Sequence, residues 1–502
     1  MKTMITRRLK LYSFFCWAVA ASMISAICAG QAASTVSDQY NGLISDRDAA
    51  QAVDYAVEPY QLFNGAAAET TLFTFPSNTT GGCYPTGTLL RDAAGALYGS
   101  TTGCPITQTN TVFRLTPPPA GQSAWRFTVL HSFTDGIDGG QPNANLVQGA
   151  DGALYGTASG YGQFLQGLVF RLNPPAPGQT QWTETVLHAF DYNFAENNGD
   201  GNEPGAGVVM DGKGALYGTT YYGGSTADPY AIGWGAVYRL TRPAPGQTAW
   251  NETVLYRFKG GADGEKPSST LTLDATGAIY GTTTTGGSQL CPQPDGSLAG
   301  CGTVFKLTPP APGRSTWTKT TLHAFNRIDG DLPWGKLLID SSGSLYGGTV
   351  AGGNVPCLDG YGHVIGCGVI FKLIPPAPGL TTWTEKVVHN FSGIPDGTGP
   401  EGGVIQEKAG NLYGTTNWGG TGICNDGVYR NPGCGTAFKL SPPVPGTTAW
   451  TETVLYDFQN SVDGSNPLGE LAPDGNGNLF GVTNGGTSSN FGAIFKIALP
   501  PA

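Results

Sequence analysis

Charged residues are scarce in this chain: they make up 12% of its 502 residues, about half of the ~25% usual for a soluble domain. Clusters of basic residues are missing, and 26 Lys and Arg against 36 Asp and Glu give a net charge of −10. This balance argues against a nucleic-acid partner, whose phosphates need a positive protein surface. Gly-x-Ser-x-Gly, P-loop and His-Glu-x-x-His motifs are also absent, so no common catalytic signature is available.

Long apolar runs are limited to one, at the N-terminus. Lys2, Arg7, Arg8 and Lys10 precede an uncharged stretch over 11–29, which small residues follow at 29–33. This order predicts a secretory signal peptide over residues 1–33, with a retained signal anchor as the alternative. No second run of this length follows, so we expect no membrane span in the mature chain. A secreted or periplasmic monomer is the expected product.

Cysteine spacing supports export. Of the 10 cysteines, eight follow the signal segment, and three pairs share one spacing. An even number in an exported chain predicts disulfides, whereas zinc sites favour closer pairs with histidines nearby. The predicted bonds are Cys291–Cys301, Cys357–Cys367, Cys424–Cys434 and, from two loops of one repeat, Cys83–Cys104.

Glycine and proline are abundant, with 77 and 36 residues, and they mark a repeat of about 60 residues. Each repeat carries Leu-Tyr-Gly or a close variant, then an apolar-aromatic-basic-apolar tetrad, a Pro-rich turn and usually a Trp-led strand. The glycines of the first motif are Gly99, Gly156, Gly218, Gly281, Gly347, Gly414 and Gly481.

Each repeat contains four strand-like segments. In one they are 207–210, 215–220, 236–241 and 251–258, and an Asp-x-x-Gly turn joins the first two. Seven repeats of four antiparallel strands predict an all-β fold, a seven-bladed β-propeller over residues 69–502. The inner hairpin resembles those of NHL-repeat and gluconolactonase-type propellers, which places the Trp-led strand outermost.

The ring should close with a strand from the N-terminus. The chain stops inside its seventh Pro-rich turn, so the seventh outer strand is missing there. Residues 69–75 supply a matching segment, which we expect to pair with 492–498 and so remove an open sheet edge. Residues 34–68 lie outside the repeats and form either a linker or a short helix.

The repeat resembles a known family. Asn411-Leu412-Tyr413-Gly414-Thr415-Thr416, followed by Gly435-Thr436-Ala437-Phe438-Lys439-Leu440 and Trp450-Thr451-Glu452-Thr453, is similar to the GloVer tandem repeat of choice-of-anchor proteins. The resemblance covers roughly residues 69–498. It implies an exported bacterial protein and brings no catalytic residues.

An Asp-Gly-x-x-Pro element recurs in six repeats, on segments that should lead to the channel mouth. Ca²⁺ favours clustered oxygens, so a ring of these carboxylates could hold it; the preferred interpretation is that each Asp accepts bonds within its own turn. The six residues are Asp138, Asp200, Asp263, Asp329, Asp396 and Asp463.

Four histidines, His131, His188, His323 and His389, share an outer-strand position with Tyr256 and Tyr456. A position that alternates with Tyr predicts a half-buried sheet residue. The basic residue of the tetrad and the Glu of Trp-x-Glu-Thr recur on neighbouring strands, and we expect them to form cross-strand ion pairs.

Aromatic residues on the face of the ring that carries the Asp-Gly-x-x-Pro segments suggest a ligand site. Trp234, Trp334 and Trp418 lie in or beside its loops, where they would either stack on sugar rings or pack within their loops. Repeat symmetry favours a non-catalytic binding or scaffold module for a glycan or an extracytoplasmic protein. The alternatives are a carbohydrate- or lactone-active hydrolase or lyase with a divalent metal in the channel, and a structural surface protein.

Overall fold

The computed structural model describes residues 67–500 apart from 77–80, 105–108, 192–198, 225–232, 245, 293–296, 359–362, 425–432 and 487–489. The predicted signal peptide and the linker or short helix before residue 67 lie outside the described residues. Within the described part, strands dominate and the helical content is one 3-10 turn, Gly261–Asp263. None of its helices has the length and apolarity needed to cross a bilayer.

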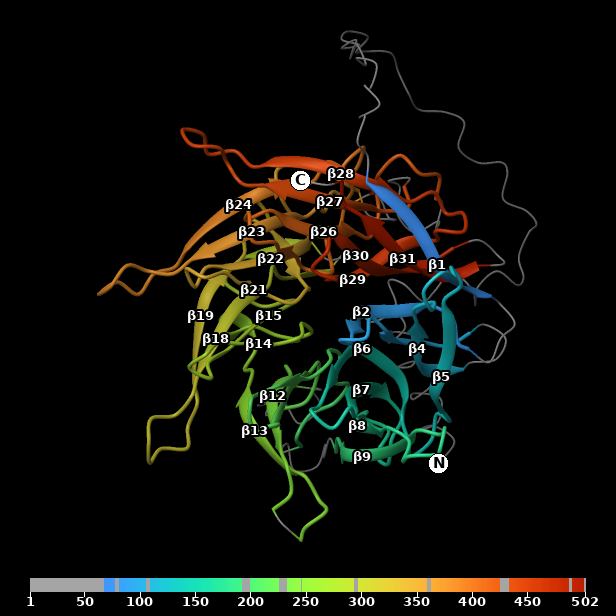
Figure 1. Ribbon diagram of the computed structural model, residues 1–502. Coiled ribbons are helices and arrows are strands. Elements are labelled where there is room, and N and C mark those ends of the chain that lie inside the picture. Colours follow the sequence, from blue (N-terminus) through green and yellow to red (C-terminus); the bar gives the residue numbers. More distant parts are fainter. Residues whose placement is uncertain are drawn as a thin grey trace, which may run out of the picture. The chain divides into compact units, whose positions relative to one another are not determined.

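Seven antiparallel sheets follow one another along the chain as the blades of a propeller (Figure 1). Blade 1 contains β2 (Pro85–Arg91), β3 (Leu97–Thr101), β4 (Asn110–Thr116) and β5 (Arg126–Phe133). Blade 2 contains β6 (Gly140–Gln148), β7 (Leu154–Gly160), β8 (Leu168–Asn173) and β9 (Thr183–Ala189). Blade 3 contains β10 (Val209–Met210), β11 (Leu216–Thr220), β12 (Ala236–Thr241) and β13 (Asn251–Arg257).

The next three blades have the same order. Blade 4 contains β14 (Thr272–Leu273), β15 (Ile279–Thr283), β18 (Thr303–Thr308) and β19 (Thr318–Ala324), with a hairpin of β16 (Leu290–Pro292) and β17 (Leu298–Gly300) in its long loop. In blade 5 the inner strand is split into β20 (Asp331–Pro333) and β21 (Leu338–Ile339), before β22 (Leu345–Ala351), β23 (Val369–Ile374) and β24 (Thr384–Asn390). Blade 6 contains β25 (Ile405–Gln406), β26 (Leu412–Thr416), β27 (Thr436–Ser441) and β28 (Thr451–Asp457).

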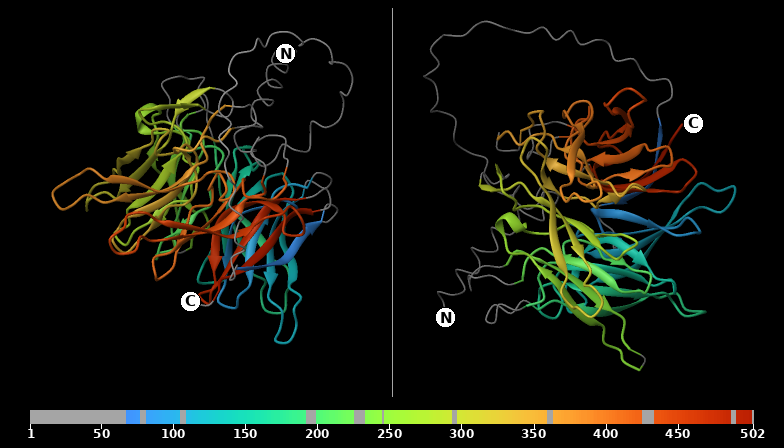
Figure 2. Two further views of the ribbon diagram at one scale, coloured as in Figure 1. Left: turned by 90° about the horizontal axis from the view of Figure 1, so that it is seen from above. Right: turned by 90° about the vertical axis from the view of Figure 1, so that its left-hand side faces the viewer.

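Blade 7 combines the two ends of the repeat region, as predicted. Its first three strands are β29 (Ser465–Pro473), β30 (Asn478–Gly485) and β31 (Asn490–Ala498), and the fourth is β1 (Ala68–Pro76). β1 pairs with β31 from Ala68 opposite Ala498 to Pro76 opposite Asn490. Figure 2 shows the blue N-terminal strand beside the red strands of this blade. β31 is therefore paired on both sides, and blade 7 has four strands like the neighbouring blades 1 and 6.

The Asp-x-x-Gly turns are fixed by their aspartates. In blade 3, Asp211 Oδ1 accepts bonds from the N–H groups of Lys213 and Ala215, both at 2.9 Å, and Oδ2 accepts from the Tyr217 hydroxyl at 3.1 Å. Gly214 completes the turn with φ 80°, a conformation that favours glycine. The turn and the following Leu-Tyr-Gly motif therefore form one unit, because the tyrosine contacts the turn aspartate.

The glycine of Leu-Tyr-Gly makes room for an aromatic ring on the next strand. A Cβ built on Gly99 would lie 2.6 Å from Cζ of Phe113, and one on Gly156 would lie 2.6 Å from Cζ of Phe170. The same close approach occurs in all seven blades. A larger side chain here would displace the ring that fills the blade interface.

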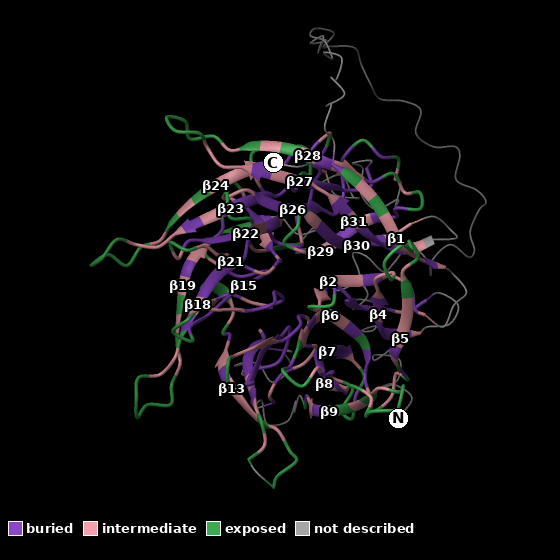
Figure 3. Ribbon diagram, in the orientation of Figure 1, coloured by how far each residue is buried: buried purple, intermediate pink, exposed green. Residues whose placement is uncertain are grey.

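Seven apolar clusters lie between neighbouring blades, and each contains an edge-to-face aromatic pair. The outer-strand Phe of one blade meets the third-strand Phe or Tyr of the next, with ring centroids 4.9–5.5 Å apart. The pairs are Phe133–Phe170, Phe190–Tyr238, Phe258–Phe305, Phe325–Phe371, Phe391–Phe438, Phe458–Phe495 and Phe75–Phe113. Phe75 of β1 completes the set. Burial is correspondingly high along the strands and low at the turn tips (Figure 3).

Candidate functional site

Antiparallel order gives the ring two distinct ends. The loops between second and third strands and the Asp-Gly-x-x-Pro segments lie at one end, the loop face. The Asp-x-x-Gly turns and Pro-rich turns lie at the other, the turn face. The four predicted disulfides, Cys83–Cys104, Cys291–Cys301, Cys357–Cys367 and Cys424–Cys434, are all formed. They hold segments of the loop face.

The six aspartates of the Asp-Gly-x-x-Pro element each contact an outer-strand His or Tyr. We call each such pair a latch. The nitrogen–oxygen or oxygen–oxygen distances are 3.9 Å for His131–Asp138, 2.6 Å for His188–Asp200, 2.8 Å for Tyr256–Asp263, 3.2 Å for His323–Asp329, 3.1 Å for His389–Asp396 and 3.0 Å for Tyr456–Asp463. Sequence reasoning identified both partners separately and missed their pairing.

Each latch carboxylate is also bound within its own turn. Asp463 accepts bonds from the N–H groups of Gln459 and Ser461, both at 2.8 Å, and from the Ser461 hydroxyl at 2.7 Å. Burial alone would raise the pKa of Asp396, but bonds from His389 and Ser392 hold it below its usual value. Protein donors thus occupy the oxygens that a cation at these aspartates would need.

A second set of acidic groups faces the latches across the blade interfaces. Glu184, Glu252, Glu385 and Glu452 each occupy the Trp-x-Glu position, and Oε1 of each is buried without a hydrogen-bond partner among the described residues. Burial, and then the latch aspartate of the preceding blade, raises the pKa of each to about 7. Near neutral pH these carboxyls therefore exist in both protonation states.

The expected ion pair between Trp-x-Glu and the basic residue of the tetrad is wrong. In blade 3, Glu252 lies opposite Leu240, whereas Arg239 lies opposite Thr253, so their side chains point to opposite faces of the sheet. The basic residues contact the turn hairpin instead: Arg171 lies 2.6 Å from Asp151, and Lys372 Nζ lies 4.7 Å from the Tyr346 ring centroid.

Seven equivalent residues on the loop face have left-handed backbones. Each immediately precedes the proline of the Asp-Gly-x-x-Pro element or its counterpart, with φ between 51° and 69°. This conformation is costly for residues other than glycine, yet only one of the seven is glycine. The residues are Tyr84, Gln141, Glu203, Lys266, Leu332, Gly399 and Asn466. Seven identical backbone positions thus display seven different residues.

Cross-blade hydrogen bonds hold these residues in place. The N–H of Glu203 donates to the carbonyl of Gln166 in the preceding blade at 2.9 Å, and the Glu203 carbonyl accepts from Tyr221 N–H at 2.9 Å. The N–H groups of Tyr84, Lys266, Leu332, Gly399 and Asn466 also donate to the loop of the preceding blade. The loop face is therefore a preorganised surface.

A titratable cluster lies between blades 3 and 4 on this face. Tyr221 and Tyr222 are 5% and 7% exposed, and their rings meet edge to face at 4.7 Å. Lys266 Nζ lies 5.8 Å from the Tyr221 ring centroid. Burial raises the pKa of Glu203 to about 7 and that of Tyr221 to about 12. No equivalent motif marked Glu203 or Lys266 in the sequence, and only their departure from the repeat could have indicated them.

The three candidate tryptophans have different surroundings on separate blades. Trp418 is 6% exposed, and its backbone pairs with Thr398. Trp234 is half-buried in the cluster between blades 3 and 4. Trp334 is half-buried as well, and it follows β20 directly. Trp234 and Trp334 therefore keep surface that a ligand could contact, whereas Trp418 mainly supports its loop.

Side chains from the inner strands meet at the ring axis. Asn145 of blade 2 donates to the Thr270 hydroxyl of blade 4, past Gly207 of blade 3. Lys336 of blade 5 lies 3.5 Å from Glu470 of blade 7. Only residues near the axis can bridge blades that are not neighbours, so polar side chains occupy the centre of the channel.

One group of described residues has the spacing of a metal site: Cys291, Cys301 and Asp331. Both sulfur atoms are joined in a disulfide, so neither can act as a thiolate ligand. Asp331 is 1% exposed, and its burial raises the pKa of its carboxyl to about 8. This group is a buried acid beside a disulfide rather than a metal centre.

Comparison with known proteins identifies the repeat. The profile of the Gloeobacter/Verrucomicrobia repeat matches residues 60–228, 183–382 and 293–501. No curated protein matches the chain.

Solved structures with similar folds have low sequence identity. PorZ, a surface component of the type-IX secretion system of Porphyromonas gingivalis, is 13% identical, with 86% of this chain and 48% of that chain covered and a TM-score of 0.44. A gluconolactonase from Xanthomonas campestris is 12% identical (86% and 90% covered, TM-score 0.33), and a glucose dehydrogenase is 15% identical (86% and 99% covered, TM-score 0.36).

Proposed function

Because the chain belongs to the Gloeobacter/Verrucomicrobia repeat family and forms a seven-bladed ring, we propose that it is an exported, non-catalytic binding module whose loop face recognises a glycan. One observation carries the proposal: seven equivalent left-handed positions display seven different residues. A symmetric scaffold with an asymmetric set of side chains suits recognition of one ligand. Four disulfides fit a secreted or periplasmic location.

Glu203, Lys266 and Trp334 are the residues we assign to ligand contact. Glu203 and Lys266 offer an acceptor and a donor on adjacent blades, and half-exposed Trp334 offers a ring face. Sugar rings combine hydroxyl groups with apolar C–H surfaces, so both kinds of contact favour a saccharide. The alternative metal-dependent hydrolase would need free carboxylates at the channel, where Glu470 instead faces the Lys336 cation.

A glycan array tests this function. Residues 34–502 should bind a subset of glycans, and Trp334→Ala and Lys266→Gln should each weaken that binding at least tenfold. Lys408→Ala, in an exposed Asp-x-x-Gly-type turn on the opposite face, is the matched control and should leave it unchanged. Absence of glycan binding, or binding that none of the loop-face variants weakens, would contradict the proposal. Elemental analysis of the purified protein would detect a bound metal and favour the hydrolase instead.

A further inference from the structure

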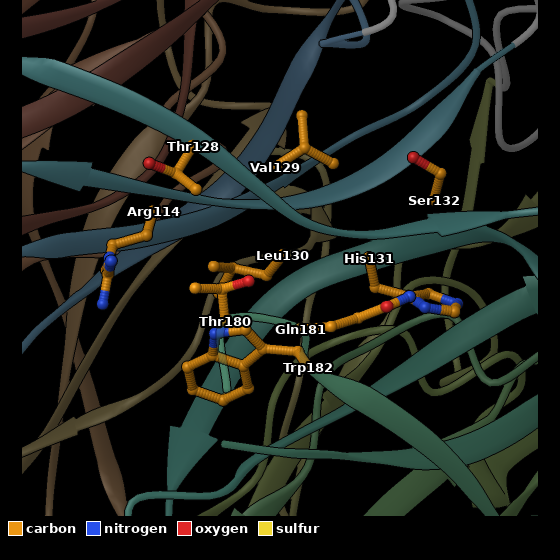
Figure 4. Close-up of a pocket in the computed structure, with 9 residues that line it drawn as sticks. All are labelled: Arg114, Thr128, Val129, Leu130, His131, Ser132, Thr180, Gln181 and Trp182. Carbon is orange, nitrogen blue, oxygen red and sulfur yellow. The ribbon is translucent and has the colours of Figure 1, made fainter. Parts of the chain in front are cut away.

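Two grooves occur between neighbouring blades, each beside an outer strand. Each is lined by the outer strand of one blade and by the Trp and the residues just before it in the next blade, and prolines of the Pro-rich turn join the lining between blades 3 and 4. The groove between blades 1 and 2 has a volume of about 480 Å³ and includes Arg114, Leu130, His131 and Trp182. Figure 4 shows this lining, which β4 and β5 contribute from one blade and the turn before β9 from the next.

The groove between blades 3 and 4 is larger and more positive. Its volume is about 870 Å³, within the usual range for ligand sites, and three of its lining residues are the cations Lys213, Arg239 and Arg314. Arg239 is the ordinary basic residue of the tetrad. Lys213 and Arg314 depart from the repeat: the equivalent positions of blades 1 and 2 are occupied by the uncharged Ala94 and Gln179.

These three cations have no carboxylate partner within ion-pair distance in the described part of the chain. Two of the other six tetrad bases have a carboxylate partner among the described residues: Arg171 pairs with Asp151 at 2.6 Å and Lys372 with Asp340 at 3.6 Å. The corresponding Asp211 accepts bonds from its own turn and from the Tyr217 hydroxyl. Lys213 and Arg314 are exposed, and Nε of Arg239 is buried without a hydrogen-bond partner. Asp211 also lines the groove, so three cations stand against one carboxylate and the lining keeps an excess of positive charge in a protein of net charge −10.

Apolar rings form the rest of the lining. Trp317 and Tyr217 lie in the cluster between blades 3 and 4, with Trp317 half-exposed, and Pro309 and Pro310 flank it. Flat apolar rings beside cations suit a ligand with both C–H faces and fixed negative charges. An acidic sugar has both, whereas a simple anion would use only the cations.

We propose that this groove binds an acidic oligosaccharide, a chain of sugar residues that carry carboxylates. The sugar rings lie over Trp317 and the two prolines, and Arg239, Arg314 and Lys213 hold the carboxylates. Bidentate geometry favours arginine for this task. The site is on the turn face, so it is independent of the glycan site proposed for the loop face.

Titration calorimetry with an oligogalacturonate at low salt tests the groove. The protein should bind this probe, and the double variant Lys213→Ala, Arg314→Gln should bind it at least tenfold more weakly. Both substitutions copy the residues at the equivalent repeat positions of blades 1 and 2, so the fold should be retained, as melting temperature can verify. A neutral oligogalactan of equal length should not bind, and added salt should weaken oligogalacturonate binding.

The reverse variant and the other face complete the test. Ala94→Lys with Gln179→Arg should give the groove between blades 1 and 2 affinity for the probe. Trp334→Ala should leave oligogalacturonate binding unchanged, which separates this site from the loop face. Equal affinity of the double variant, or equally strong competition by inorganic phosphate, would overturn the proposal, the second by revealing a general anion patch.

Discussion

At the scale of single residues, the latches explain why six aspartates repeat. In each, one carboxylate joins an outer strand to the segment that leads into the next blade, as Asp463 does through Tyr456 and Ser461. The sequence revealed the Asp and His/Tyr periodicities but not their contact, because the partners lie six to twelve positions apart in the chain. The Trp-x-Glu residues were assigned the wrong partner, because their actual neighbour belongs to the preceding repeat.

Calcium should have no effect on stability. The latch carboxylates already accept bonds from protein donors, so CaCl₂ and EDTA should leave the melting temperature unchanged in calorimetry, because an ion that does not bind the folded state cannot stabilise it. A calcium-dependent rise in melting temperature would restore the cation-site interpretation.

The latch aspartates should instead matter for stability. Asp463→Asn should lower the free energy of unfolding by about 1–3 kcal/mol, because an amide replaces one buried acceptor oxygen with a donor. The exposed Asp191→Asn serves as the control.

Asp331 should limit stability above neutral pH. Its pKa is raised from 3.8 to about 8 by burial, so the folded state holds an extra proton between these values and loses stability as pH rises through that window. Asp331→Asn should therefore raise the melting temperature at pH 8 and have less effect at pH 4. A variant that melts lower than the parent at pH 8 would show that the ionised carboxylate is accommodated.

At the scale of elements, strand order was predictable and strand length was not. The predicted inner strand 207–210 is reduced to β10, Val209–Met210, because Gly207 lies against Asn145 near the axis and leaves the ladder. The hairpin of β16 and β17 was also not predicted, since its loop lacks a clear strand pattern. The residues of the turns determine the hairpins, whereas contacts at the ring axis determine where an inner strand such as β10 begins.

β1 should be essential for the ring. Phe75 is 1% exposed and supplies the seventh edge-to-face pair with Phe113, so Phe75→Ala should cost about 3–5 kcal/mol of unfolding free energy. Phe133→Ala, the equivalent change within a continuous blade, should cost a similar amount in chemical denaturation. A much smaller cost at Phe75 would show that β1 closes the blade only loosely.

Truncation tests the same strand as a whole. Removal of residues 34–75 deletes β1 and should cause aggregation or a large drop in melting temperature, because β31 becomes an open edge. Removal of 34–66 keeps every β1 pair and should be tolerated. Equal melting temperatures for the two proteins would contradict closure by β1.

At the scale of the whole molecule, the interface glutamates should make stability depend on pH. Glu184, Glu252, Glu385 and Glu452 have pKa values raised from 4.5 to about 7. The folded state therefore holds more protons than the unfolded state between pH 4.5 and 7, and the free energy of unfolding falls as pH rises through this range.

The melting temperature should accordingly be higher at pH 5 than at pH 8. Glu252→Gln with Glu452→Gln should flatten this slope, because the amides do not ionise. Blade 4 offers the converse variant, because Lys319 occupies the position of these glutamates and lies 3.2 Å from the latch carboxylate of Asp263. Lys319→Glu should place a fifth glutamate beside a latch aspartate and so steepen the slope. A melting temperature that does not change between pH 5 and 8 would contradict these assignments.

Closure by β1 also has a consequence for the order of folding. Of the strands in the described residues, the first to be synthesised pairs with the last, since Glu69 lies opposite Ile497. Contacts between such distant parts of a chain form slowly, because a very long loop must close. Until then Leu72, Phe73 and Phe75 lack the cluster that later covers them. Among the described strands, β1 therefore stays accessible to chaperones and proteases for the longest time. Its pairing with β31 is the step that makes the chain resistant to both.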